Sequence, residues 1–183
     1  LITTSTQVSH KLDLRGLGQD NNTLMETLLR VTGLANNPQD FNFNALASLP
    51  DQVPDTSKLV AGREGSSVRL AALLRVVEPK EDAHFITLES TGGDFSASIA
   101  IDAIVDQSLI LYRLGNAPLP INKGGPFRFL VIDPSACTLD EIDACANVKH
   151  LGRIDLSPYQ GRDMRPTSVN EHAQHHENEL HGG

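Results

Sequence analysis

The densest group of possible metal ligands lies near the end of the chain. It consists of histidines and glutamates within the last thirteen residues, among them His172, His175 and His176. In a helix, His172 and His176 would lie on one face because they are four residues apart. Imidazole and carboxylate donors at this spacing suit Zn, Ni or Cu. A solvated polar tail that binds no metal is the simpler interpretation of the same residues.

The chain contains two cysteines, Cys137 and Cys145, so it can form one disulfide at most. A disulfide that closes this short loop would stabilise the fold by roughly 2–3 kcal/mol in an oxidising compartment. Two unpaired thiols are an equally good interpretation. Two cysteines are too few for a zinc site unless histidines complete it.

Composition excludes several classes of function. The formal net charge is −8, which argues against a nucleic-acid partner, because phosphate binding needs a basic face. No apolar run approaches the roughly 20 residues that span a bilayer, so no membrane insertion is expected. No nucleophile elbow, phosphate-binding loop or dinucleotide motif occurs. The sequence predicts a soluble protein and does not distinguish a periplasmic or secreted compartment from the cytoplasm.

Hydrophobic periodicity predicts a mixed α+β domain. Thr23 is expected to cap a short helix that runs through Val31 and ends at Gly33. Further short helices are expected at residues 44–49, 68–77 and 102–107, the last with Asp102 as its cap. Strands are expected at residues 84–89, 95–101, 109–114, 127–132 and 148–156, with a hairpin turn at residues 90–93.

The order of these segments resembles the sulfite-oxidase-type molybdopterin-binding domain. Its motifs are matched by Leu46-Ala47-Ser48-Leu49-Pro50, Val68-Arg69-Leu70, Gly125-Pro126-Phe127-Arg128 and Lys149-His150-Leu151-Gly152-Arg153-Ile154. The match covers about residues 41 to 157. The resemblance implies a β-rich fold with short peripheral helices and a polar cleft for a molybdenum-carrying pterin.

The resemblance also implies site residues. Arg128 and Lys149 match positions that line the pterin-phosphate cleft, and Lys123 replaces a histidine there; a surface charge without a ligand is the competing interpretation. In the family a cysteine thiolate holds the metal, and a soft thiolate suits molybdenum. The matching interval, residues 51–67, contains no cysteine. His150 replaces a tryptophan of the family pattern.

We therefore expect three segments: an N-terminal extension with one short helix at residues 1–40, the molybdopterin-binding-like domain at 41–157, and a polar His-rich tail at 158–183. The leading hypothesis is a relative without cofactor that acts in binding or subunit assembly, with its polar termini contacting a protein partner or a second copy. One alternative is a divergent molybdopterin-dependent oxidoreductase acting on a small oxyanion or oxide. The other is a metal-binding protein that uses the tail.

Overall fold

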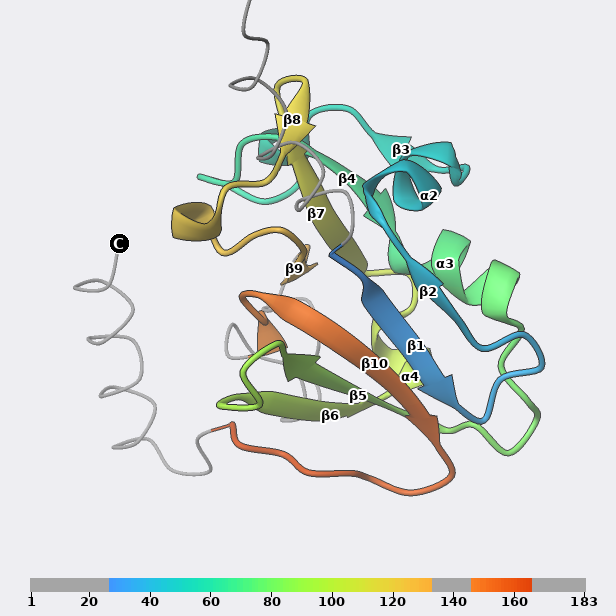
Figure 1. The fold of residues 1–183 in the computed structure, drawn as a ribbon. Helices are drawn as coiled ribbons and strands as arrows, with labels where there is room; N and C mark the ends of the chain where they lie inside the picture. Colours follow the sequence, from blue (N-terminus) through green and yellow to red (C-terminus); the bar gives the residue numbers. More distant parts are fainter. Residues whose placement is uncertain (1–26, 133–145, 166–183) are drawn as a thin grey trace, which may run out of the picture.

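The computed structural model describes residues 27–132 and 146–165. Five strands form a first sheet in the order β2-β1-β10-β5-β6 (Figure 1). Strands β1 and β10 are parallel, and the remaining neighbours in this sheet are antiparallel. Their bounds are Leu29–Gly33 for β1, Gln39–Phe41 for β2, Phe85–Ser90 for β5, Ser96–Ala100 for β6 and Leu151–Ser157 for β10.

A second sheet is built around the long strand β7, in the order β3-β4-β7-β8. Strand β9 also pairs with β7, along the N-terminal half of β7. All of these pairs are antiparallel. The bounds are Gln52–Val53 for β3, Ser66–Arg69 for β4, Ser108–Leu114 for β7, Ala117–Pro118 for β8 and Arg128–Val131 for β9.

The two sheets are joined by backbone hydrogen bonds at the approach to β10. Phe129 and Val148 exchange two hydrogen bonds, with N···O distances of 2.9 and 3.2 Å, and the Leu151 N–H donates to the Phe127 carbonyl at 2.8 Å. The segments that match the family pattern at residues 125–128 and 148–154 therefore lie side by side. Side chains at residues 125–128 and 148–151 are therefore positioned by strands of both sheets.

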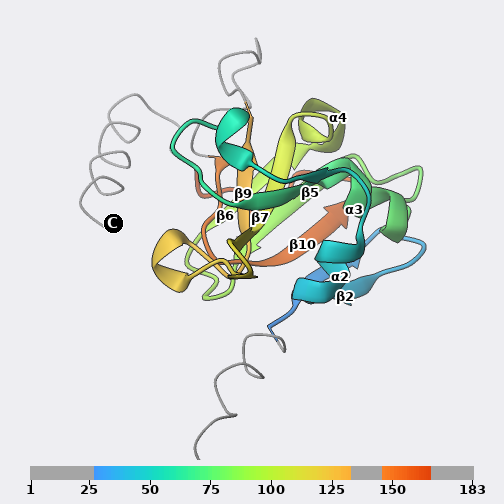
Figure 2. The same cartoon turned by 90° about the horizontal axis from the view of Figure 1, so that it is seen from above.

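Short helices complete the domain. Helix α2 (Phe43–Ser48) begins at Asn42, whose side chain accepts from the Ala45 N–H at 2.9 Å. Helices α2 and α3 lie beside each other at one side of the domain (Figure 2). The bounds of the others are Leu70–Val77 for α3, Ile101–Ile104 for α4, Thr56–Lys58 for the 3-10 turn η1 and Ile121–Lys123 for the 3-10 turn η2. The predicted α+β class with short peripheral helices is confirmed.

Buried apolar side chains form two clusters, and β7 contributes to both. Ile110 and Tyr112 belong to the main core between the first sheet and the helices, whereas Leu109 and Leu111 belong to a smaller cluster. Strand β7 is therefore buried on both faces, as expected from the period-two alternation of side chains along a strand.

The helix predicted to end at Gly33 is wrong over the residues that the structure describes. Leu29 and Val31 are buried and alternate with outward-facing residues, which is the pattern of a strand, and β1 pairs in parallel with β10. Gly33 has a φ of +86°, and a Cβ there would lie 2.1 Å from the Leu156 carbonyl oxygen. The close approach of two strands, not a helix terminus, requires this glycine.

The predicted boundary between the N-terminal extension and the domain, at residue 40, therefore moves toward the N-terminus. Strands β1 and β2 belong to the first sheet, so residues 29–41 are part of the domain and not of an extension.

Two predicted helices begin at other residues than expected. Helix α3 begins at Leu70 because Val68 and Arg69 lie in β4. Helix α4 begins after Ala100, so Asp102 is not its cap.

Residues 158–165 also belong to the folded domain, because they cross the outer face of β5 and β6. The Gly161 N–H donates to the Ser98 hydroxyl, and the Met164 N–H donates to the Ser96 carbonyl, each at 2.8 Å. Ser96 and Ser98 point away from the core yet are almost completely buried. The predicted tail therefore begins no earlier than residue 166.

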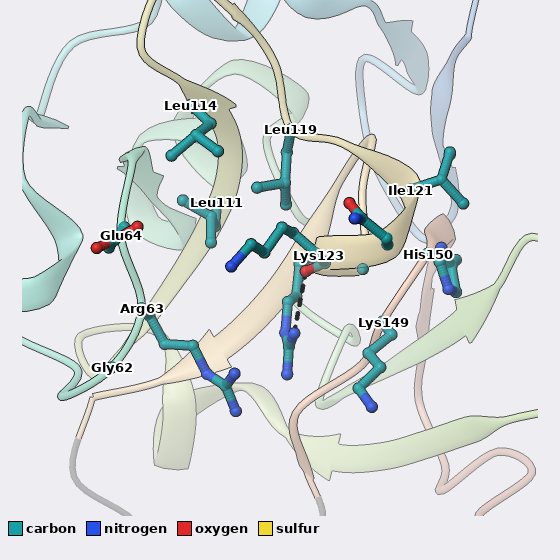
Figure 3. Close-up of a pocket in the computed structure, with 13 residues that line it drawn as sticks. Gly62, Arg63, Glu64, Leu111, Leu114, Leu119, Ile121, Lys123, Lys149 and His150 are labelled. Atoms are coloured by element: carbon teal, nitrogen blue, oxygen red, sulfur yellow. Dashed lines mark hydrogen bonds between the residues drawn. The ribbon is translucent and has the colours of Figure 1, made fainter. Parts of the chain in front are cut away.

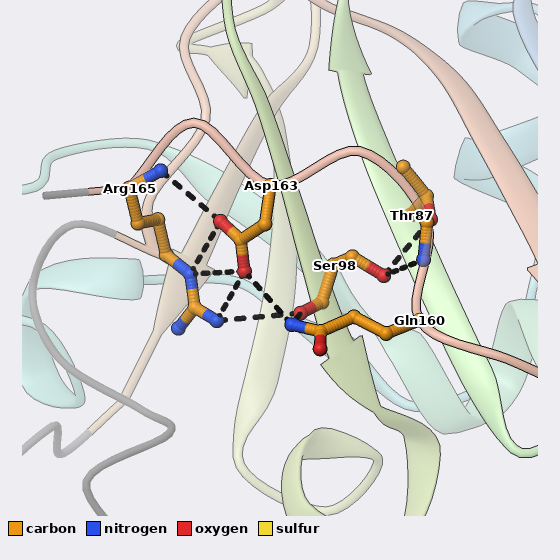
Figure 4. A network of polar contacts seen from close by, with 6 residues as sticks. Thr87, Ser98, Gln160, Asp163 and Arg165 are labelled. Atoms are coloured by element: carbon orange, nitrogen blue, oxygen red, sulfur yellow. Dashed lines mark hydrogen bonds and ion pairs between the residues drawn. The ribbon is translucent and has the colours of Figure 1, made fainter. Parts of the chain in front are cut away.

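An ion pair fixes the end of this segment (Figure 4). Arg165 Nη2 lies 2.6 Å from Asp163 Oδ2, and the same guanidinium donates to the Ser98 carbonyl at 3.3 Å. Burial alone would raise the pKa of Asp163, but the hydrogen bonds and charge of Arg165 outweigh it and hold that pKa below its usual value. Gln160 adds a weaker contact to the same carbonyl.

Candidate functional site

A pocket of about 680 Å³ opens at the junction of the two sheets (Figure 3). Four parts of the chain line it: the loop at residues 62–64, the C-terminal half of β7, the turn η2 with Gly124, and residues 149–150 before β10. Leu119, between β8 and η2, and Arg128, at the start of β9, complete the lining. Elements that are distant in the sequence thus meet at one site.

The three residues that the resemblance singled out meet in this pocket. Lys123, Arg128 and Lys149 all line it. Arg128 is only 5% exposed, and its Nη1 donates to the Lys123 carbonyl at 3.0 Å. Lys149 is half-buried and Lys123 is exposed at the rim. The guanidinium is therefore fixed, whereas the ammonium of Lys123 can adjust to a ligand.

The turn at Gly124 and Gly125 brings these cations together. Gly124 has a φ of +86°, and a Cβ there would lie 3.1 Å from Arg128 Cδ and 3.2 Å from Lys149 Cγ. A Cβ on Gly125 would lie 1.9 Å from the Leu119 carbonyl oxygen. The absence of side chains at both positions lets the chain pass closely between its neighbours.

His150 links this turn to the start of β10. Its N–H donates to the Gly124 carbonyl at 2.8 Å, and its Nδ1 lies 2.7 Å from the Gly125 carbonyl oxygen. Since a carbonyl oxygen only accepts, Nδ1 carries the proton in this contact. The His150 carbonyl in turn accepts from the Thr91 N–H at 2.7 Å. The imidazole is held by the backbone, and Lys149 is positioned with it.

The structure adds a cation that the sequence analysis missed. Arg63 lines the pocket between Gly62 and Glu64, and it comes from the interval where the family pattern places the metal-binding cysteine. Within the part of the chain that the structure describes, Arg63 makes no ion pair. The sequence did carry a signal for this residue, because Arg63 lies between Gly62 and Gly65 in the interval that should supply the metal ligand.

The charges of the lining residues favour an anion. Four basic side chains, Arg63, Lys123, Arg128 and Lys149, share the pocket with one acidic side chain, Glu64. This local excess of positive charge stands out in a chain whose net charge is −8. Guanidinium and ammonium groups are the usual partners of phosphate-like oxyanions.

The two ends of a molybdenum-carrying pterin fit these residues differently. A phosphate end suits the four cations. The metal needs a thiolate, and the described residues that line the pocket include no cysteine. Cys137 and Cys145 lie outside the described residues, as do His172, His175 and His176. No group of three or more possible metal ligands occurs within residues 27–132 and 146–165.

No helix in the described ranges has the length and apolar character needed to cross a membrane.

The fold and the pocket together define an α+β domain with an anion site between two sheets. The family model for the oxidoreductase molybdopterin binding domain matches residues 55–163, which is more than half of the chain. The chain therefore belongs to that family.

A solved structure has a similar fold, and a search of the curated proteins found no match. The similar structure is the sulfane dehydrogenase SoxCD from Paracoccus pantotrophus, with a TM-score of 0.57 and 15% sequence identity. The match covers 78% of this chain and 41% of that chain. At this identity the likeness concerns the fold alone.

Proposed function

We propose that this domain binds a phosphate-type anion in its pocket and performs no molybdenum-dependent oxidation or reduction. In this proposal it is a cofactor-free member of its family that acts as a binding protein or as a binding subunit of an assembly. The observation that carries the proposal is the identity of the residue supplied by the interval at residues 51–67. That interval contributes Arg63 to the pocket and contains no cysteine.

The chemistry of the two side chains differs in kind. A thiolate donates electron density to a soft metal, whereas a guanidinium carries a permanent positive charge and has no lone pair to donate. Arg63 would therefore repel a metal cation and attract an oxyanion. Together with Arg128 it would offer two planar hydrogen-bonding groups to the same ligand.

One observation favours the enzyme hypothesis as a second candidate. A divergent molybdopterin-dependent oxidoreductase requires Lys123, Arg128 and Lys149 to converge on one phosphate-sized pocket, and all three line the pocket described above. If that cofactor binds, these cations would hold its phosphate, and the cofactor would supply the redox chemistry. No residue of the described lining offers the thiolate that the metal needs.

Calorimetric titration of the purified chain with inorganic phosphate tests the binding proposal. Arg63→Gln should weaken binding about fivefold, because one unit charge a few ångströms from the anion contributes roughly 1 kcal/mol even in a water-like medium. Lys58→Gln is the matched control: Lys58 is largely exposed and is not part of the pocket lining.

The outcomes separate the two candidates. Binding that Arg63→Gln weakens and Lys58→Gln leaves unchanged supports an anion site in the pocket. No detectable binding, or equal loss in both variants, contradicts it. Molybdenum at one atom per chain in natively purified protein, with pterin fluorescence after oxidation, would establish the enzyme instead.

A further inference from the structure

Residues 158–165 cover the outermost strand of the first sheet. Strand β6 ends the order β2-β1-β10-β5-β6, and such an edge strand presents main-chain groups that no neighbouring strand pairs. The Met164 N–H donates to the Ser96 carbonyl at 2.8 Å. The guanidinium of Arg165 donates to the Ser98 carbonyl at 3.3 Å (Figure 4). The segment therefore supplies donors to β6 that a neighbouring strand would otherwise supply.

This cover is held by polar contacts and not by apolar burial. None of residues 158–165 is buried, and its two large apolar side chains, Tyr159 and Met164, are 80% and 39% exposed. The hydrogen bonds to β6 and the ion pair of Asp163 with Arg165 hold the segment in place. Segments with few buried apolar contacts are the ones that open at low cost in free energy.

The cover also fits the strand imperfectly. Ser96 is 2% exposed, yet no group in the described part of the chain hydrogen-bonds its hydroxyl. A buried hydroxyl without a partner costs free energy, and opening of the cover would return it to water. A Cβ on Gly161 would lie 2.3 Å from Thr87 Oγ1, so only glycine lets the segment approach β5 this closely. The closed arrangement thus depends on a few polar contacts and one glycine.

We propose that β6 is a pairing surface for a second copy of this chain, and that residues 158–165 are a removable cover that competes with that copy. The two copies pair through antiparallel β6 strands after both covers have opened. None of residues 158–165 lines the anion pocket, so this inference stands apart from the proposed function.

The composition of β6 suits pairing with itself. Residues 96–100 include no charged residue and no proline, the residue types with which edge strands commonly prevent strand addition. Two identical strands that pair antiparallel are related by a two-fold axis, so the contact closes at two copies and does not continue into a filament. The carbonyls of Ser96 and Ser98, which the cover now engages, would accept main-chain N–H groups of the partner strand.

Analytical ultracentrifugation of the purified chain tests the proposal with two variants that open the cover in different ways. The double substitution Asp163→Ala/Arg165→Ala removes the ion pair and the guanidinium contact to β6. Gly161→Val places a side chain against Thr87. If each raises the open population about tenfold, the association constant should rise about a hundredfold, because both copies must open. The unsubstituted chain should remain monomeric at concentrations where both variants dimerise.

Two controls accompany these variants. Arg30→Ala/Asp40→Ala removes an exposed ion pair at the opposite edge of the same sheet, where Arg30 Nε lies 3.3 Å from Asp40 Oδ1, and should leave the chain monomeric. Ser98→Lys, added to the Asp163→Ala/Arg165→Ala variant, places a charge on the β6 edge and should return it to the monomer. Circular dichroism and urea unfolding establish that each variant is folded.

The outcomes are distinct. Dimers in both opened variants that Ser98→Lys abolishes support the proposal. Folded monomers in both opened variants at every concentration overturn it. Association that Ser98→Lys leaves unchanged, or assembly that continues beyond two copies, also overturns it, because another surface or an unspecific open edge then joins the chains. The phosphate titration is a separate measurement, and its failure would overturn the proposed function alone.

Discussion

The substitution Gly124→Ala should impair anion binding as well as stability. Gly124 has a φ of +86°, so any L-residue there costs about 1–2 kcal/mol in backbone strain. The new Cβ would lie 3.1 Å from Arg128 Cδ and 3.2 Å from Lys149 Cγ. Both side chains must shift by a few tenths of an ångström. A charge-assisted hydrogen bond is worth about 1.5–3 kcal/mol, and weakening it partly should reduce phosphate affinity about fivefold.

Gly93→Ala provides the matched control. Gly93 has a φ of +68° in the hairpin turn between β5 and β6, and a Cβ there would meet nothing within 4 Å. The two variants should lose similar free energies of unfolding in urea titrations, because the backbone strain is the same. Only Gly124→Ala should lose phosphate affinity in calorimetry. Equal phosphate affinities in the two variants would refute the view that Gly124 positions Arg128 and Lys149.

Three further predictions concern the fold. Gly33→Ala should lower the free energy of unfolding by about 3 kcal/mol or more, well beyond Gly93→Ala, because its Cβ clashes with backbone of the paired strand; similar losses would argue against the parallel pairing of β1. The lowered pKa of Asp163 contributes stability that is present above the unfolded value near pH 4 and is lost as pH falls through the folded value. Asp163→Asn should therefore reduce the fall in the free energy of unfolding on the acid side of a pH series. An unchanged pH dependence would show that the ion pair of Asp163 with Arg165 does not stabilise the fold. Tyr112→Phe should cost about 1 kcal/mol in urea unfolding through loss of one hydrogen bond, and a neutral result would show that water replaces the phenol.

Local sequence patterns predicted most of the elements because they depend on neighbouring residues alone. The helix before Pro50 is capped by Asn42 and ends where proline excludes it, and the hairpin turn at residues 90–93 joins two alternating strands. The failure at residues 29–33 had a different cause. Leu29 and Val31 fit both a helical and an alternating pattern, and only pairing with β10, more than 120 residues away, selects the strand.

The candidate site was predictable in part. The resemblance identified Lys123, Arg128 and Lys149, and the fold brings all three to one pocket. Arg63 could not be placed by pattern, because its loop meets the other cations only through the junction of the two sheets. The presence of Arg63 and the absence of a cysteine in residues 51–67 become meaningful once the loop at residues 62–64 is known to line the pocket.

Elemental analysis of the full-length protein, purified from its natural source without added metal, tests the central claim most directly. The account predicts no molybdenum above the buffer blank and no pterin fluorescence after oxidation. Near-stoichiometric molybdenum, released together with a fluorescent pterin, would contradict it and would assign the cations of the pocket to the phosphate of that cofactor.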